Sequence, residues 1–186
     1  MNLLVFIGSL RADSVTAKVA EFAIAQTPDD VHVRVWDQIA ELPHYNEDFE
    51  GDDLPAVGSQ LREAIAAADA LLLVTPEYNG ALPSGLKNVI DWASRPYGAA
   101  AIKGKPTGII GTSRSSRAAQ WSRENAARSL EIAGADVLPD TVGVGSHFET
   151  VTDQGPTDEA TIAAIKSLLA HLQRAAEQTR STASRG

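Results

Sequence analysis

The chain alternates short, continuous apolar runs with longer segments in which apolar residues recur at helical spacing. A short apolar run bounded by turn residues is typical of a buried strand, and the helical spacing indicates a helix with one apolar face. The predicted strands cover 3–7, 31–35, 70–74, 106–110 and part of 136–144, and the predicted helices cover 15–26, 57–68, 86–93, 116–133 and 157–177. This alternation favours an α/β fold in which helices cover both faces of a parallel sheet.

Five strands joined in this way predict a doubly wound, flavodoxin-like sheet. The run at 31–35 alternates apolar and polar residues, which places it nearer an edge of the sheet. We expect one domain over residues 1–178, followed by a disordered tail at 179–186 that ends in small polar residues. Ligands of such sheets bind beyond the carboxyl ends of the strands, so the loops after the first, third and fourth strands form the candidate site.

Composition excludes several classes of protein. The 186 residues are 44% hydrophobic and 22% charged, which is typical of a folded globular chain. The absence of cysteine excludes disulfides, iron–sulfur clusters and a thiolate nucleophile, and the four histidines show no metal-ligand spacing. A formal charge of −8 argues against nucleic acid and anionic membranes as partners. Because no targeting segment or membrane span is evident, we expect a cytoplasmic protein.

The loop after the first strand, residues 8–16, offers groups that bind phosphate. Ser9, Ser14 and Thr16 supply hydroxyls, and Arg11 supplies a planar guanidinium group. The helix that follows adds free N–H groups and the positive end of its dipole. The alternative is that Ser14 simply caps this helix, which requires no ligand.

The loops lack the common nucleotide-binding and hydrolase motifs. A dinucleotide-binding turn requires three glycines, and the first loop has only Gly8. Residues 104–107 resemble the end of a Walker A motif, but a proline interrupts the motif and a strand follows it instead of a helix. Residues 111–115 lack the second glycine of a nucleophile elbow. The stretch 99–130, with six basic residues and one acidic residue, suits a small anionic ligand, although a solvated helix face would explain it equally well.

The loop after the third strand, residues 75–85, contains two prolines and two glycines, which predict a stiff and tightly turned segment. Tyr78 offers a flat face, and Asn79 together with backbone N–H groups offers hydrogen bonds to a planar heterocycle. Taken alone, this loop could equally be a turn that packs a tyrosine.

Three segments together resemble the NADPH-dependent FMN reductase family, which also includes related quinone, azo and chromate reductases. They are Gly8-Ser9-Leu10-Arg11, Pro76-Glu77-Tyr78-Asn79-Gly80 and, on the next helix, Leu86-Lys87-Asn88-Val89-Ile90-Asp91-Trp92. Residues 43–48 resemble the family's loop after its second strand, and the resemblance spans residues 3–145 in order and with fitting spacing. It implies a flavodoxin-like fold, tightly but noncovalently bound FMN, and a homodimer or homotetramer with the flavin near a subunit interface.

The resemblance assigns FMN-binding roles by position. The residues implied to hold the phosphate are Ser9, Arg11, Ser14 and Thr16, and those implied to line the ring, partly through backbone atoms, are Pro76, Glu77, Tyr78, Asn79 and Gly80. Thr16 stands where the family often has asparagine. No side chain is expected to act as a catalytic group, because the flavin itself carries the chemistry.

The loop after the fourth strand departs from the family pattern, which is often rich in glycine. Residues 111–117 read Gly-Thr-Ser-Arg-Ser-Ser-Arg, so side-chain donors replace the close backbone approach that glycines allow. Ser113 is implied to reach the flavin. Arg114 or Arg117 is expected to meet the 2′-phosphate that distinguishes NADPH from NADH. The alternative is that these arginines are solvent-exposed side chains at the start of a helix.

The implied function is transfer of a hydride from NADPH, or NADH, to bound FMN. Electrons then pass to a small acceptor such as free flavin, a quinone, an azo compound or a nitro compound, in a ping-pong sequence. One alternative is a flavodoxin-like electron carrier that docks on partner proteins, which a net charge of −8 suits. Another is a flavin-binding sensor with little NAD(P)H turnover. The residues do not identify the acceptor, the preferred nicotinamide cofactor or the number of subunits.

Overall fold

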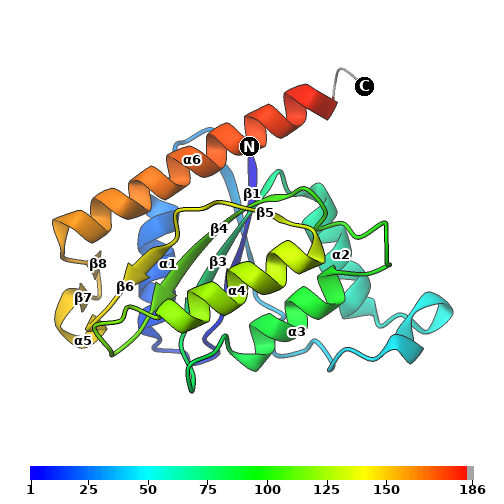
Figure 1. The fold of residues 1–186 in the computed structure, drawn as a ribbon, viewed down its shortest axis with the longest axis horizontal. Coiled ribbons are helices and arrows are strands. Elements are labelled where there is room, and N and C mark those ends of the chain that lie inside the picture. Colours follow the sequence, from blue (N-terminus) through cyan, green and yellow to red (C-terminus); the bar gives the residue numbers. More distant parts are fainter. Residues whose placement is uncertain (184–186) are drawn as a thin grey trace.

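The computed structural model describes residues 1–183 and confirms the flavodoxin-like α/β fold (Figure 1). The strands of the central sheet are β1 (Asn2–Ile7), β2 (His32–Trp36), β3 (Ala70–Pro76), β4 (Pro106–Thr112), β5 (Asp136–Val137) and β6 (Val142–Val144). Their order is β2-β1-β3-β4-β5, with β6 also beside β4, and every pair is parallel. The carboxyl ends of the strands therefore meet at one edge of the sheet.

The fifth position of the sheet is interrupted. We expected one strand within 136–144, whereas β5 pairs with the start of β4 and β6 with its end. The segment between them contains Pro139, which has no N–H group to donate to a neighbouring strand. The interruption lies at an outer position of the sheet, where a lost hydrogen bond is best tolerated.

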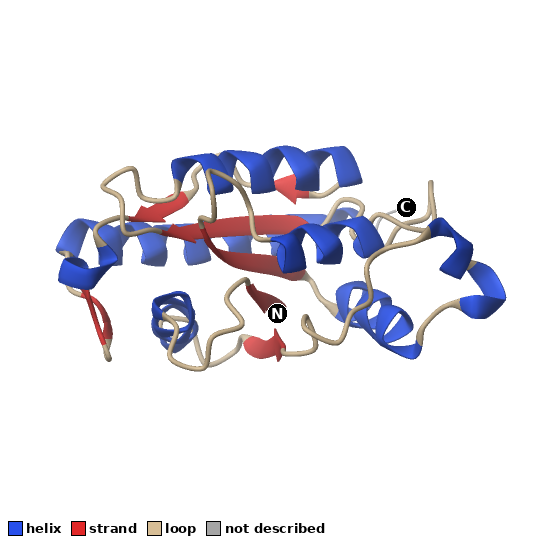
Figure 2. Ribbon diagram, turned by 90° about the horizontal axis from the view of Figure 1, so that it is seen from below, coloured by secondary structure: helices blue, strands red, loops and turns tan. Residues whose placement is uncertain are grey.

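Helices cover both faces of the sheet (Figures 1 and 2). They are α1 (Val15–Ala25), α2 (Ala56–Ala67), α3 (Ser84–Ala93), α4 (Gln120–Ala133), the short α5 (His147–Thr150) and α6 (Glu159–Ala183). Alternate side chains of β1 point to opposite faces of the sheet and pack in different apolar clusters. Leu4 and Phe6 join the apolar cluster of α2, α3 and α4, while Leu3 and Val5 join that of α1 and α6. Burial on both faces explains why the strands are apolar throughout.

Three features of the structure were not predicted. Two 3₁₀ turns, η1 (Glu47–Phe49) and η2 (Gly51–Asp53), lie within the long loop after β2. Beyond β6, α5 leads into an antiparallel hairpin of β7 (Val151–Thr152) and β8 (Gly155–Pro156). Finally, α6 continues through Ala183, past residue 178, where we expected the ordered domain to end. The rest of the expected tail, residues 184–186, lies outside the described residues.

The hairpin after α5 is attached to α1. Lys18 on α1 forms ion pairs with Asp153 in the hairpin turn, at 2.8 Å, and with Asp13 before the helix, at 2.9 Å. Gly155 lies against Phe22 of α1 and has a φ of +102°, which favours glycine. The segment that follows β6 is thereby held beside the loop that follows β1.

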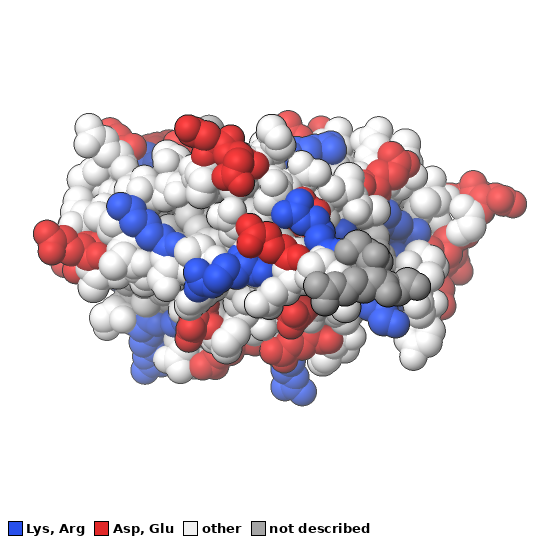
Figure 3. Space-filling model, turned by 90° about the horizontal axis from the view of Figure 1, so that it is seen from above, with Lys and Arg blue, Asp and Glu red and all other residues white. Residues whose placement is uncertain are grey.

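Charges are mixed on the surface that Figure 3 shows, which carries α6. Lys and Arg side chains lie among Asp and Glu side chains, without a broad area of one sign. Among residues 1–183, no helix has both the length and the apolar character needed to cross a membrane.

Replacing Gly155 by alanine should destabilise the protein more than the same change at Gly98. Both glycines have positive φ, so each substitution costs about 1–2 kcal/mol of backbone strain. Only at Gly155 would the new Cβ also meet a side chain, 2.6 Å from Phe22 Cβ, which adds about 1–3 kcal/mol of overpacking. Urea unfolding of both variants measures the difference. Equal losses would contradict the packing of the hairpin on α1.

Candidate active site

The loops at the carboxyl edge of the sheet enclose a cavity of about 530 Å³. Its walls come from the loops after β1, β3 and β4 and from the segment after β6. The lining residues are Ser9, Arg11, Asp13, Ser14, Val15, Thr16, Lys18, Pro76, Glu77, Tyr78, Thr112, Ser113, Arg114, His147, Phe148 and Val151. The structure thus brings together nine of the twelve residues singled out from the sequence. Asn79, Gly80 and Arg117 are not part of the lining.

The loop after β1 presents its polar groups to this cavity. Ser14 has extended backbone and caps α1, where its Oγ accepts a hydrogen bond from Ala17 N at 3.4 Å. Arg11 donates one N–H group to the Asp13 carbonyl oxygen at 2.9 Å, which holds its guanidinium group over the loop. The Asp13 carboxylate, the one acidic group in the loop, pairs with Lys18, which lowers the pKa of Asp13 and partly offsets its charge, since Lys18 also pairs with Asp153. An anion at the start of α1 would therefore face less repulsion.

Thr16 lines the cavity but already has a partner. It is buried, and its hydroxyl lies 2.8 Å from the Thr112 hydroxyl at the end of β4. This contact joins the start of α1 to β4 across the sheet, between residues 96 positions apart in the sequence. Its role as a phosphate ligand stays a prediction.

The loop after β3 is a two-residue hairpin turn. Tyr78 and Ala81 exchange backbone hydrogen bonds of 3.1 and 3.0 Å, and Asn79 and Gly80 between them have φ values of +52° and +73°. Asn-Gly is the sequence that such a turn favours. The Tyr78 side chain is 49% exposed, so its ring is available to a ligand rather than packed in the core. Gly80 instead faces the ring of Trp121.

The Glu77 carboxylate points to α4. Its Oε2 atom accepts a hydrogen bond from Ser122 N, at 3.1 Å, in the first turn of that helix. The buried Ser122 hydroxyl lies 2.9 Å from the Thr75 hydroxyl and donates to the Pro76 carbonyl oxygen at 2.8 Å. These contacts fix the loop after β3 on α4, so Glu77 would meet a ligand through atoms other than its carboxylate.

The loop after β4 delays the start of the next helix. We expected a helix from residue 116, whereas α4 begins at Gln120 because Ala118 and Ala119 both have a φ of +54°. Alanine in this left-handed conformation costs about 1–2 kcal/mol per residue. The loop therefore adopts a left-handed backbone conformation that favours glycine, although both positions are occupied by alanine. Such strain is often found beside functional sites.

The two arginines of this loop occupy different places. Arg114 lines the cavity, and its guanidinium carbon lies 4.4 Å from the ring centroid of Phe148. Arg117 stacks on Trp121 at 4.6 Å, outside the lining. Ser113 accepts a hydrogen bond from Ser115 N at 3.1 Å, and its O–H group has no acceptor among the described residues. Arg114 and Ser113 are thus the polar groups that this loop offers to a ligand.

Sequence reasoning missed His147, Phe148 and Val151, which come from the segment after β6. The segment is too short to show a helical or strand period, and it reaches the cavity only because the hairpin folds back on α1. Burial, followed by the charges of Arg114 and Arg11, lowers the pKa of the His147 imidazole. The ring packs against Phe148 with centroids 4.7 Å apart.

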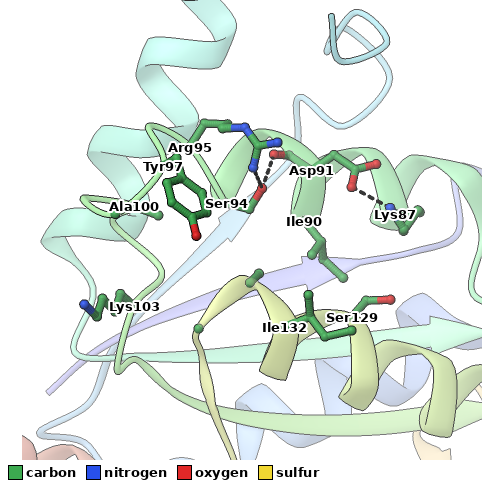
Figure 4. Close-up of a pocket in the computed structure, with 13 residues that line it drawn as sticks. Lys87, Ile90, Asp91, Ser94, Arg95, Tyr97, Ala100, Lys103, Ser129 and Ile132 are labelled. Atoms are coloured by element: carbon green, nitrogen blue, oxygen red, sulfur yellow. Dashed lines mark hydrogen bonds and ion pairs between the residues drawn. The ribbon is translucent and has the colours of Figure 1, made fainter. Parts of the chain in front are cut away.

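A second cavity, of about 600 Å³, opens between the ends of α3 and α4 (Figure 4). None of the residues predicted for the site lines it. Lys87 and Asp91 on its wall pair with each other, while Tyr97 and Ile132 are 93% and 79% exposed. Within residues 1–183, no cluster of metal-binding side chains occurs in either cavity.

Known reductases are similar to this chain in sequence. A 2-hydroxy-1,4-benzoquinone reductase from a Burkholderia species is 44% identical over 113 residues, which are 61% of each sequence. A quinone reductase from Pseudomonas putida is 42% identical over 112 residues, or 60% of each sequence. The matched part of the chain thus spans 60–61% of the length of these curated relatives.

A solved structure matches over nearly the whole chain. FerB, a flavoenzyme NAD(P)H:(acceptor) oxidoreductase from Paracoccus denitrificans, superposes with a TM-score of 0.84 at 32% identity, covering 95% of this chain and 97% of that one. The family model described as NADPH-dependent FMN reductase matches residues 1–149. The chain therefore belongs to the NADPH-dependent FMN reductase family, as its loop motifs predicted.

Proposed function

We propose that this protein is an NAD(P)H-dependent oxidoreductase that binds FMN noncovalently in the cavity at the carboxyl edge of the sheet. One observation carries the proposal: the loops after β1, β3 and β4 place an arginine, serine hydroxyls, a helix N-terminus and an exposed tyrosine around a single cavity. When bound, FMN supplies the centre that accepts a hydride from NADPH or NADH and returns electrons to a second substrate.

The residues around the cavity fit the two ends of FMN. Ser9, Arg11 and Ser14 would hold the phosphate at the start of α1, where Arg11 has further N–H donors beyond the one given to Asp13. The ion pair of Asp13 with Lys18 reduces the repulsion that a dianion would meet there. A volume of about 530 Å³ lies within the range of cofactor sites.

The hairpin after β3 would orient the flat ring. The exposed Tyr78 ring offers an apolar surface, and Pro76, Asn79 and Gly80 offer backbone groups that the contacts with Ser122 and Trp121 hold in place. The Ser113 hydroxyl is available to donate a hydrogen bond to an electron-rich edge of the ring. By holding the ring and keeping water from it, these residues would orient FMN for hydride transfer.

Relatives suggest the class of acceptor. The two curated relatives are named as reductases of quinones, and FerB as an oxidoreductase with an unspecified acceptor. We propose quinones as acceptors, with free flavin, azo and nitro compounds as further candidates, and a ping-pong sequence in which both substrates use the same site in turn. The cytoplasmic location stays a prediction.

The decisive test is the visible absorption spectrum of the purified protein before and after NADPH is added without air. We expect a yellow protein whose absorption bleaches promptly, because a reductase accepts the hydride without a partner protein. A yellow protein that does not bleach would favour the electron carrier or the sensor. A colourless protein that also fails to take up added FMN would overturn the proposal.

Arg114 is the better placed of the two arginines to meet the 2′-phosphate of NADPH. Replacing Arg114 by alanine should raise KM for NADPH about tenfold or more, since a hydrogen bond to a charged group contributes about 1.5–3 kcal/mol. KM for NADH should change little, and Arg117→Ala serves as the matched control because Arg117 does not line the cavity. Equal effects on both cofactors, or a larger effect of Arg117→Ala, would exclude this role for Arg114. Steady-state kinetics with each cofactor gives the result.

We also propose that the protein assembles as a homodimer or homotetramer, with a second copy covering the cavity between α3 and α4. The exposed Tyr97 and Ile132 side chains form an apolar surface there, and it is flanked by basic and acidic side chains that could pair across two copies. Burying such side chains contributes about 1.5–3 kcal/mol each.

Replacing Ile132 by glutamate should shift the protein from an oligomer to a monomer. The change would place a charge in the apolar surface of the proposed interface. Arg174→Glu, on the exposed side of α6, is the control, because it also adds negative charge but lies in the opposite helix layer. Light scattering during gel filtration measures the mass. A monomeric wild type, or an unchanged mass for Ile132→Glu, would argue against this interface.

A further inference from the structure

His147 is a cavity residue whose side chain the fold leaves without a polar partner. Its backbone N donates to the Ser113 carbonyl oxygen at 3.2 Å, which fixes the residue beside the loop after β4. The ring lines the cavity and packs on Phe148. Its Nδ1 atom is buried and has no hydrogen-bond partner among the described residues. A neutral imidazole always carries one N–H donor, and no acceptor for it lies among the described residues, so an acceptor on a ligand in the cavity would stabilise the ring.

The two charges that act on the pKa of His147 are both positive. Arg11 approaches from the loop after β1 and Arg114 from the loop after β4, and both disfavour the imidazolium form. The remaining charged groups of the neighbouring elements are Asp13, Lys18, Glu77, Asp153 and Glu149, of which Glu77 accepts a hydrogen bond from Ser122 N. Asp13 and Asp153 both pair with Lys18, and Glu149 is exposed on the same short helix as His147. Burial adds to the effect of the arginines, so the imidazole is neutral near pH 7 in the ligand-free protein.

We propose that His147 is a further phosphate-binding residue of the site, and that it takes up a proton from solvent when the phosphate dianion of FMN binds beside Arg11. The inference rests on the proposed function, because it assigns a residue to the phosphate end of FMN. The proton comes from water or buffer and is held on a ring nitrogen, while the phosphate remains a dianion. No bond other than the N–H bond forms.

The physical basis is that the electrostatic potential at the His147 ring changes from positive to negative when the phosphate binds. Before binding, two guanidinium groups repel a third positive charge. A dianion placed beside Arg11 and His147 outweighs this repulsion and accepts a hydrogen bond from the imidazolium, which raises the pKa of His147 in the complex. The complex then binds more protons than the free protein, so FMN affinity must rise as pH falls between the two pKa values. Each unit by which the pKa rises contributes about tenfold in affinity.

Titration of the flavin-free full chain with FMN tests the proposal. FMN affinity is measured at about pH 6 and pH 8, on either side of the ordinary histidine pKa of ~6.5. The change in affinity between the two pH values is compared for the wild type, for His147→Gln and for His32→Gln. His32 is exposed on β2 and lies outside the cavity, so it controls for the loss of a histidine as such. The phosphate also titrates near pH ~6, but it does so equally in all three proteins.

We expect the affinity gain toward pH 6 to be about tenfold larger in the wild type and in His32→Gln than in His147→Gln. Riboflavin, which lacks the phosphate, should show no such difference. Identical pH dependence in all three proteins would overturn the proposal, and so would a difference that persists with riboflavin. If FMN fails to bind the wild type at either pH, the proposed function fails together with the inference.

Calorimetry of the wild type gives an answer that does not depend on any variant. Titrations with FMN near pH 7 in two buffers of different ionisation enthalpy report the protons exchanged on binding. Selection of the phosphate dianion alone releases protons, whereas protonation of His147 takes them up. Net uptake therefore supports the proposal, and net release or no exchange contradicts it.

Discussion

Burial of the central strands on both faces is the constraint on which the rest of this structure depends. Because β1, β3 and β4 are apolar on both sides, each must be covered by helices in two layers, and the chain must cross over between parallel neighbours. Parallel strands end at the same edge of the sheet. Loops that are separated by long stretches of sequence therefore meet there, and the candidate site follows from this meeting.

Buried hydroxyl groups then fix the loops relative to one another. The contact between Thr16 and Thr112 joins the loop after β1 to β4, and Ser122 joins the loop after β3 to α4. Each of these hydroxyls is buried and has a hydrogen-bond partner, so none carries the cost of an unpaired polar group. The Ser113 O–H group and the His147 ring, which have no polar partner among the described residues, both line the cavity.

Most of the fold could be predicted from the sequence, because the apolar runs of strands and the helical spacing of apolar residues are both local signals. The strands and the three loops of the site followed from apolar runs and turn residues, and the tight turn within 75–85 followed from its prolines and glycines. What could not be predicted depends on contacts between distant residues. His147 enters the site only through the packing of the later hairpin on α1, and the Glu77 carboxylate turns to α4 only because Ser122 N lies there. The late start of α4 required two alanines to accept a conformation that their type disfavours.

These two alanines, Ala118 and Ala119, also bear on the entropy of binding. Glycine at the same positions would leave the loop after β4 free to sample many backbone conformations, and a ligand would have to select one of them. A methyl group at each position reduces the number of accessible backbone conformations, so the loop loses less conformational entropy when a ligand binds. The free-energy cost of the left-handed backbone arises when the protein folds, and the loop is then already ordered before a ligand binds. Alanine at these two positions would thus make the loop less stable and, at the same time, lower the entropy cost of binding a ligand.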